Sequence, residues 1–547
     1  MSPRGSWPRG GVRTRLPITF WKSGAEFTPA EIPGLALWLD ASDASTLFQD
    51  AAATTPATAT SDPVGAWLDK SGNARHATQA TAGSRPTRSV AINTRSAVLL
   101  ANGAVQRLTA NGVYMDALGD NTNKRITILA TLQSSGQSQQ KSIGEVDQGS
   151  GFGCYHNISN IAYFDAGAGV PASRAQGALA SSVITGGAVF IGRRDGGAVD
   201  QWYNGALIAG SLTSATGSLR TAGDNPFSVK AVNSGSLAYG EVLVYNRALT
   251  SAERQRAERY LASRWGITLA PQVSNADAQD WINRVYANGG QVSASTAAAV
   301  NQFCLDIENA PGGSIRDRFY RLNLFCGSNL NAALVPLYRG PSLGGTQYGG
   351  ATDTNVGGLF VSGDYNETGA SGGLKGNGTT KHLDTGFQQS TVSLSNLHLS
   401  ASFLQMDTSG TAERTLIGHY NAAQADFAVL RSAITSGNME FFAGSFSGAS
   451  STSYLSSASH LMGVRSSQTS AVMYSAGVSV GTSATNVGSP STSALSYFVF
   501  ARNNGGTADT RTSVRIRMYS IGQAIDAAGA SAFANAVAAF NTAMGRT

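Results

Sequence analysis

The stretch that decides the fold reads Gly-Glu-Val-Leu-Val-Tyr-Asn-Arg-Ala-Leu over 240–249 and continues as Thr-Ser-Ala-Glu-Arg-Gln-Arg-Ala-Glu-Arg-Tyr-Leu over 250–261. The first part is apolar in the manner of a strand, and the second has the spacing of an amphipathic helix. Thr250 and Glu253 form a Thr-x-x-Glu capping box, and Gly266 is placed to end the helix. The segment therefore predicts a strand, a short turn and a well-capped helix.

The same pattern occurs a second time at the C-terminus. There 513–522 reads Ser-Val-Arg-Ile-Arg-Met-Tyr-Ser-Ile-Gly, and an Ala-rich stretch follows over 526–544. Long segments with short apolar runs and many turn residues precede both copies, as in all-β domains. The sequence therefore predicts two copies of one all-β module, each closed by a terminal helix.

The length of 547 residues is too great for a single hydrophobic core. We expect four parts, namely an extended basic N-terminal arm over 1–32, a first β-sandwich over 33–271, a helical connector over 272–340 and a second β-sandwich over 341–547.

The connector is predicted from helical periodicity. Residues 276–286 and 293–307 lack Gly and Pro and place apolar residues at helical spacing. Residues 315–334 are expected to add one or two more helices. We expect this connector to have a core of its own.

Charge is scarce and unevenly distributed. Charged residues are 13% of the chain, about half the usual share. Of the net charge of +6, +4 lies in the first thirty residues, so basic character is confined to the arm and no specific nucleic-acid partner is expected. An arm that carries both arginines and aromatic residues predicts docking onto another protein, through Arg4, Trp7, Arg9, Arg13, Arg15 and Trp21.

The sequence predicts neither a membrane span nor a disulfide framework. No apolar run approaches the roughly 20 residues of a span, and no secretory apolar region follows the basic N-terminus. We therefore expect synthesis in a cytoplasm. Cys154, Cys304 and Cys326 are too few and too scattered for a disulfide framework or a zinc site, and we expect buried free thiols.

Four motifs of the first module resemble a known family. They are Gly-Leu-Ala-Leu-Trp-Leu-Asp-Ala-Ser-Asp (34–43), Trp-Leu-Asp-Lys-Ser-Gly-Asn-Ala-Arg-His-Ala-Thr (67–78), Trp-Tyr-Asn-Gly (202–205) and Glu-Val-Leu-Val-Tyr-Asn-Arg-Ala-Leu (241–249). Together they resemble the concanavalin A-like (laminin G-like) jelly-roll domains carried by structural proteins of tailed bacteriophages. The resemblance is weaker over the second module, which lacks Trp and both Trp-Leu-Asp motifs.

The resemblance implies a mainly β fold with two concanavalin A-like jelly-roll sandwiches, each ending in a helix, joined by a small helical connector. It also implies a non-enzymatic structural component of a phage virion, made in the host cytoplasm and anchored to other virion proteins by the arm. In one reading, as in a tail fibre or appendage, outward lectin-like domains bind host-surface glycans. In the alternative the chain is a head or tail decoration or cement protein that binds no sugar. Virion symmetry suggests a homo-oligomer, with a trimer as the candidate.

Hydrolase chemistry is not expected. Enzymes of this superfold place acidic residues at alternating positions of one strand, so that the acid and the nucleophile share a sheet face. The nearest match, Glu145-Val-Asp147, lacks the third acid because position 149 is Gly149.

Two candidate sites follow from residue type. A flat ring beside an amide is a common sugar-binding arrangement, so Trp202, Tyr203 and Asn204 are the glycan-binding candidates. Asp69 and Asn73 are candidate calcium ligands, as in some laminin G-like domains. Asp, Asn, Ser and Gly also form tight turns, and this alternative stays open.

Overall fold

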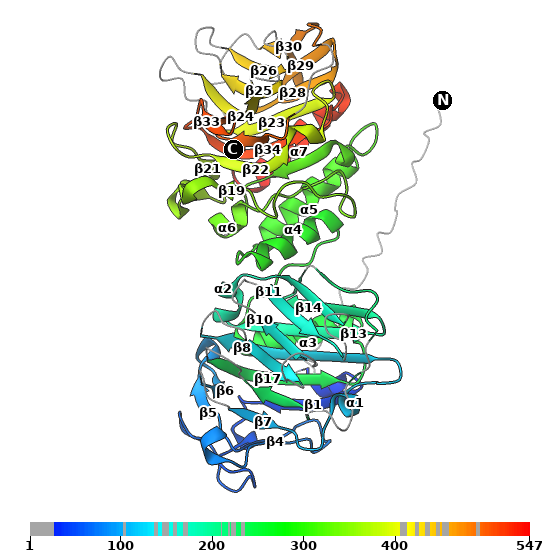
Figure 1. Cartoon of the computed structure of the whole chain (residues 1–547), viewed down its shortest axis with the longest axis vertical. Coiled ribbons are helices and arrows are strands. Elements are labelled where there is room, and N and C mark those ends of the chain that lie inside the picture. The colour runs from blue at the N-terminus through cyan, green and yellow to red at the C-terminus, as the bar shows by residue number, and fades with distance from the viewer. Residues whose placement is uncertain are drawn as a thin grey trace, which may run out of the picture.

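The computed structural model shows two β-sandwich modules stacked along the long axis, with a helical segment between them (Figure 1). The described residues are 27–101, 106–135, 140–144, 153–156, 161–167, 173–208, 210–216, 219, 226–230, 236–404, 413–421, 426–432, 438–444, 449–450, 459–487 and 493–546.

The first module consists of two facing antiparallel sheets. One runs in the order β15 (Ala206–Leu207), β14 (Ala198–Tyr203), β13 (Ala188–Asp195), β8 (Arg125–Ser134), β17 (Leu237–Tyr245), β6 (Ser96–Leu100) and β5 (Thr87–Val90), and β1 (Leu35–Asp40) also pairs with β17. The other runs in the order β12 (Arg174–Ala178), β11 (Ile161–Asp165), β10 (Gly153–His156), β9 (Gln140–Gly144), β16 (Ser228–Lys230), β7 (Arg107–Thr109), β4 (Ala77–Thr78), β3 (Ala66–Trp67) and β2 (Leu47–Phe48). Two short helices, α1 (Met115–Leu118) and α2 (Ser181–Thr185), lie in the connections.

The second module is built in the same way. Its first sheet runs in the order β30 (Val478–Ser483), β29 (Ser470–Ser475), β28 (Ser459–Ser467), β23 (Leu397–Phe403), β34 (Arg515–Gly522), β21 (Gly373–Lys375) and β20 (Tyr365–Asn366), and β18 (Phe319–Asn323) also pairs with β34. Its second sheet runs in the order β27 (Ala449–Ser450), β26 (Met439–Ala443), β25 (Asp426–Ser432), β24 (Arg414–Asn421), β31 (Ser496–Val499), β22 (Leu383–Gln388) and β19 (Thr354–Asn355). β32 (Arg502–Asn504) pairs with β24 and with β33 (Thr507–Asp509).

The strand orders of the two modules correspond one to one in their first sheets. β8 occupies the place of β23, β17 that of β34, and β1 that of β18. The second sheets correspond from β12 to β4 and from β27 to β19. The prediction of a mainly β chain with two copies of one sandwich, each ending in a helix, is confirmed.

Each sandwich is covered on the outer face of its first sheet by its terminal helix. In β17 the alternating side chains of Val242 and Val244 enter the core between the sheets, whereas those of Leu243 and Tyr245 pack beneath α3 (Ser251–Trp265). In the second module α7 (Ala527–Ala543) covers the corresponding face. Both faces of the central strands β17 and β34 are therefore buried.

Helix α3 begins and ends where the sequence predicts. The Thr250 hydroxyl accepts a hydrogen bond from the Glu253 amide, and the Glu253 carboxylate accepts one from the Thr250 amide. At the other end Gly266 adopts a left-handed φ of 64°, and its amide bonds back to Ala262. This hydrogen bond closes the last turn. Glycine adopts the left-handed conformation with the smallest energetic penalty of any residue.

The helical segment agrees with prediction in its first half only. α4 (Ala276–Ala287) and α5 (Ala294–Glu308) match the predicted helices within one residue. The prediction of further helices over 315–334 is wrong in its first part. That stretch contains a single 3-10 turn (Arg316–Arg318) and the strand β18, and its only α-helix is the short α6 (Leu330–Ala333).

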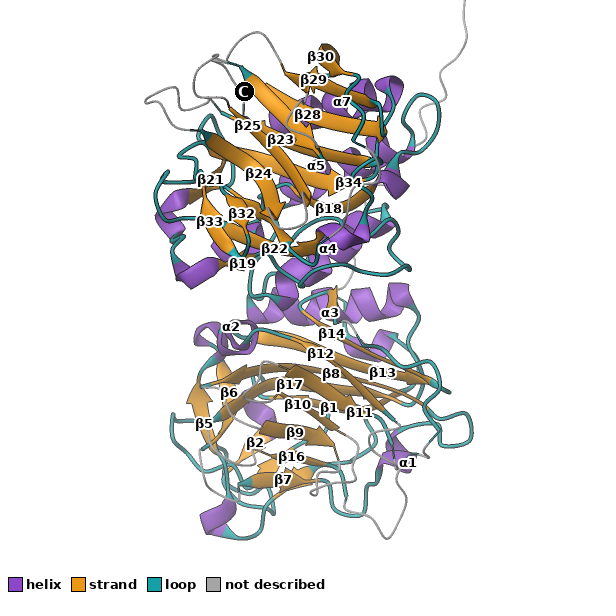
Figure 2. Cartoon of the chain, turned by 45° about the horizontal axis from the view of Figure 1, so that its top comes forward, coloured by secondary structure: helices purple, strands orange, loops and turns teal. Residues whose placement is uncertain are grey.

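The separate core predicted for the connector is also wrong. Phe303 of α5 packs against Phe533 and Phe540 of α7, in one cluster with Met462 and Val464 of β28. Figure 2 shows these helices against the second sandwich. The segment over 272–340 therefore shares its core with the second module and gives that module a strand.

The two thiols of this region are buried and free, as predicted. Neither Cys304 nor Cys326 is in a disulfide. Burial raises the pKa of the Cys304 thiol to about 12, which makes it unreactive at neutral pH.

Candidate functional site

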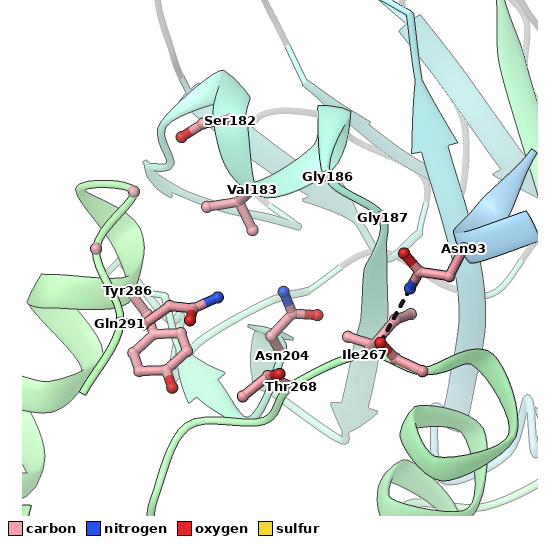
Figure 3. A pocket seen from close by; sticks show the side chains of 13 residues that line it. Asn93, Ser182, Val183, Gly186, Gly187, Asn204, Ile267, Thr268, Tyr286 and Gln291 are labelled. Atoms are coloured by element: carbon pink, nitrogen blue, oxygen red, sulfur yellow. Dashed lines mark hydrogen bonds between the residues drawn. The ribbon is translucent and has the colours of Figure 1, made fainter. Parts of the chain in front are cut away.

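A polar pocket of about 200 Å³ lies where the first module meets the end of α4 (Figure 3). One wall comes from α2, from the turn between β14 and β15, and from the chain just after α3; the other comes from the C-terminal end of α4. The lining residues are Asn93, Ser182, Val183, Gly186, Gly187, Asn204, Gly266, Ile267, Thr268, Tyr286, Gly289, Gly290 and Gln291.

Asn204 lies at the centre of the first wall. Asn204 and Gly205 form the two-residue turn between β14 and β15, with φ values of 49° and 84°. Asn-Gly is the pair that such a turn favours, because both residues tolerate positive φ. The Val189 amide donates to Asn204 Oδ1 at 2.8 Å, and the Gly205 amide donates to Glu258 Oε1 at 2.7 Å. These bonds fix the turn and leave the Asn204 side-chain NH₂ to face the pocket.

The second wall is held against the first by direct contacts. The Ala180 amide donates to the Ala287 carbonyl at 2.6 Å, and the Tyr286 hydroxyl of α4 donates to the Leu269 carbonyl, after α3, at 3.3 Å. A Cβ on Gly289 would lie 2.5 Å from Ser182 Oγ, so only a glycine permits this approach. The relative position of the two walls is therefore defined by close backbone packing.

The polar groups that face the pocket are uncharged. Figure 3 shows the side-chain amides of Asn204 and Gln291 pointing toward one another across it. Within the described part of the chain, Asn204 Nδ2, the Gln291 side-chain amide and the Thr268 hydroxyl make no hydrogen bond to protein atoms. Asn93 Nδ2 instead donates to the carbonyls of Trp265 and Gly266. The pocket thus offers neutral donors and acceptors to a ligand.

Of the three predicted glycan-binding residues, only Asn204 reaches this pocket. Trp202 is 9% exposed and packs under α3 between the guanidinium groups of Arg193 and Arg254. Tyr203 is 3% exposed and packs on Phe190 between the sheets. Neither ring has an open face on which a sugar could stack, because α3 covers one side of this strand and the sandwich core covers the other.

The predicted calcium ligands form a turn. Both carboxylate oxygens of Asp69 accept hydrogen bonds, from the amides of Trp38, Ser71 and Arg75 among others. Asn73 directs its NH₂ group, a donor, at the carbonyls of Leu35 and Ala36. This is the alternative left open by the sequence. Among the described residues, no three His, Cys, Asp or Glu side chains gather as metal ligands would.

A buried cluster of charge, missed by sequence reasoning, lies under α3. Glu241 Oε1 accepts from the Trp38 indole at 2.7 Å and from the Tyr260 hydroxyl at 3.0 Å. Asp40 Oδ2 accepts from Lys70 Nζ and Arg264 Nη2, each at 2.9 Å. The motifs around 34–43, 67–78 and 241–249 therefore meet in one hydrogen-bonded network that ties α3 to the sheet. The sequence signal for this network was that each of the three motifs contains a tryptophan or an acidic residue.

Some predicted residues lie outside the described residues. These are the docking residues Arg4, Trp7, Arg9, Arg13, Arg15 and Trp21, together with Glu145 and Asp147. Residues 27–32, the end of the predicted arm, are described and pack on the first module. No helix in the described ranges has both the length and the apolarity needed to cross a bilayer.

No protein-family model matches the chain, and no curated protein matches it. Partial similarity is found to the binding domain of Paraclostridial Mosquitocidal Protein 1, with 11% identity over 42% of this chain and 52% of that chain and a TM-score of 0.31. Trypanosoma rangeli sialidase in complex with sialic acid is 16% identical over 43% of this chain and 33% of that chain, with a TM-score of 0.25. The botulinum neurotoxin serotype G binding domain is 15% identical over 37% of this chain and 51% of that chain, with a TM-score of 0.29. The chain thus spans about half the length of the two binding domains and a third of the sialidase. The sequence identities and TM-scores are too low to transfer a function to this chain.

Proposed function

We propose that the chain is a non-enzymatic structural component of a phage virion that binds a glycan in the pocket between its first module and α4. The observation that carries the glycan-binding part is a set of neutral polar groups that converge on one pocket without partners in the described chain: Asn204 Nδ2, Thr268 Oγ1 and the Gln291 side-chain amide. Sugar hydroxyls both donate and accept, and amides and hydroxyls complement them in both roles.

The size of the pocket limits the ligand. Its 200 Å³ is below the range of about 300–1,000 Å³ that is typical of sites for drug-sized ligands. A single sugar unit at the end of a chain fits this volume better than an extended oligosaccharide. The absence of charged lining residues among the described ones favours a neutral unit.

The non-enzymatic part rests on the same lining. Glycoside hydrolysis ordinarily requires two carboxyl groups beside the scissile bond, and none is among the lining residues. Two buried acids, Asp40 and Glu241, do lie close together in the first module. They are under α3 and are engaged in hydrogen bonds there.

The virion role rests on the sequence resemblance and on the arm. The Tyr245 hydroxyl donates to the Pro29 carbonyl at 3.0 Å, and Arg256 pairs with Glu31 at 2.6 Å, so residues 29–31 already pack on the first module. We propose that residues 1–26 dock onto other virion proteins and that the chain acts in the particle as a homo-oligomer, with a trimer as the candidate.

Glycan binding is tested with purified protein on a glycan array, followed by calorimetric titration of the best ligand. Thr268→Val combined with Gln291→Leu should weaken binding at least about tenfold, the loss of one or two hydrogen bonds. Thr81→Val combined with Gln302→Leu removes the same groups at exposed positions away from the pocket and should change nothing. If no neutral glycan binds, or both double variants bind alike, the decoration role without sugar binding is favoured.

The docking role is tested by deleting residues 1–26. The truncated chain should fold, because it keeps both sandwiches and the contacts of residues 27–32 with the first module, but it should not enter particles assembled in infected cells. Incorporation at the normal copy number would contradict the docking role and leave the glycan result unaffected.

A further inference from the structure

A second hollow of the first module has the opposite chemistry to the pocket. It is a groove of about 540 Å³ on the solvent side of α3, and it is called the arginine groove below. Its lining residues are Phe27, Arg95, Arg256, Arg259, Tyr260, Ser263 and Arg264. Four of these seven residues are arginines, and none is acidic.

The helix explains why these side chains gather. Arg256, Arg259, Tyr260 and Ser263 stand at positions i, i+3, i+4 and i+7 of α3, which places them on one face. Arg95 joins them from the turn before β6. The opposite face of α3, with Leu261 and Trp265, is buried on the sheet, so the arginine face looks outward.

Two of the arginines are held in place by rings and carboxylates. Arg256 lies over the Phe27 ring at 4.2 Å and pairs with Glu31 at 2.6 Å. Arg264 lies over the Tyr260 ring at 5.9 Å and pairs with Asp40. The Phe27 and Tyr260 rings themselves meet edge to face at 5.6 Å. The groove therefore has ordered walls before any ligand arrives.

The other two arginines supply unbalanced charge. Arg95 and Arg259 are exposed, and within the described residues neither has an ion pair with a carboxylate. Arginine presents a planar fork of N–H donors that matches a carboxylate with two parallel hydrogen bonds. The groove thus combines an aromatic floor with two free carboxylate-binding groups.

We infer that the arginine groove binds an acidic oligosaccharide, a chain of sugar units that carry carboxylates. Guanidinium groups bind the carboxylates, and the partly exposed Tyr260 ring and the Ser263 hydroxyl face the sugar rings. Its volume is within the range of small-ligand sites. This site is separate from the neutral pocket and does not depend on the proposed function.

Other occupants fit the groove less well. Residues 1–26 of the chain are themselves basic, with five positive charges against one negative, and are repelled by the unpaired charges of Arg95 and Arg259. A nucleic-acid duplex needs a far broader basic surface than one helix face provides, since even single modules bury about 600–1,000 Å². A short acidic sugar chain fits both the charge and the size.

The test is binding of hexagalacturonate to the full chain, measured by calorimetry at low and physiological salt. Wild-type protein should bind it, and more weakly at high salt because exposed charges are screened. Arg95→Gln combined with Arg259→Gln should weaken binding roughly tenfold to a hundredfold, as expected for two charge-assisted hydrogen bonds. A neutral hexasaccharide of equal length should not bind this groove.

A matched control removes the same charge elsewhere. Arg107→Gln combined with Lys375→Gln alters two exposed residues away from α3 and should leave binding unchanged. The Thr268→Val, Gln291→Leu variant should also bind normally, which separates this result from the neutral pocket. No binding, equal loss in the control, or tighter binding of oligo(dT) that the groove variant abolishes would overturn the inference.

Discussion

Glu241 Oε2 accepts a hydrogen bond from the indole N–H of Trp265 at 3.0 Å, and both side chains are fully buried between the sheet and α3. Burial, together with the neighbouring Asp40 carboxylate, raises the pKa of Glu241 to about 7. A carboxyl group that keeps its proton in the folded state and loses it in the unfolded chain makes stability depend on pH.

The first prediction concerns this dependence. Between the ordinary pKa of 4.5 and about 7, the folded state binds the proton and the unfolded state does not, so the free energy of unfolding should fall as pH rises. The fall should be at most about 3 kcal/mol. Urea unfolding from pH 5 to 8 measures it. Glu241→Gln cannot titrate and should give a flatter profile; an unchanged profile would refute the assignment.

The second prediction concerns the ion pair between Arg321 and Asp353. Arg321 Nη2 lies 2.7 Å from Asp353 Oδ1, with neither side chain exposed. Arg321→Met would leave a buried carboxylate without its cation, at a cost of about 3–5 kcal/mol. Adding Asp353→Asn removes the uncompensated charge and should recover part of the loss. A single variant within 1 kcal/mol of wild type, by urea unfolding, would contradict this account.

The third prediction concerns the extent of the second module. A fragment of residues 272–547 should fold and unfold cooperatively, because it contains β18, α4 and α5 as well as the sandwich. A fragment of 341–547 lacks the strand beside β34 and the partners of α7, so it should aggregate or melt without a sharp transition. Circular dichroism melts compare the two, and equal midpoints would show that the helical segment is dispensable.

The fourth prediction concerns the cap of α3. Thr250→Ala removes the hydroxyl that accepts from the Glu253 amide, and it should lower the free energy of unfolding by about 1 kcal/mol. Thr250→Ser keeps the acceptor and serves as the control. Equal stability of the two variants in the same denaturation experiment would mean that the cap contributes nothing.

The repeated architecture could be predicted from local signals. The capping box at Thr250 and the glycine at 266 fix the ends of α3 through backbone hydrogen bonds made within one turn. The helices α4 and α5 follow from their own apolar spacing. Where an element is specified by its own residues, sequence reasoning located it.

β18 could not be found in this way. Its residues, Phe319–Asn323, are a strand because β34, almost 200 positions away, offers an unpaired edge. The same limit applied to Trp202. Alternation shows that its ring leaves the sandwich core, but only the packing of α3 shows that this outer face is also closed.

The pocket could not be predicted either, because it is formed by contacts between segments that are far apart in the sequence. Asn204 was selected for its place beside two aromatic residues, yet its place in the pocket comes from the Asn-Gly turn and from Gln291 on a different segment. No local pattern links these two amides, because they meet only when α4 packs on β15.

The pairing of β1 with β17, and of β18 with β34, has an evolutionary consequence. In each sandwich the first strand lies beside the last, so the chain enters and leaves at neighbouring points of one sheet. Such a unit can be spliced into a chain, duplicated or exchanged without threading through another core. A further copy can follow an existing one without disturbing the core already formed.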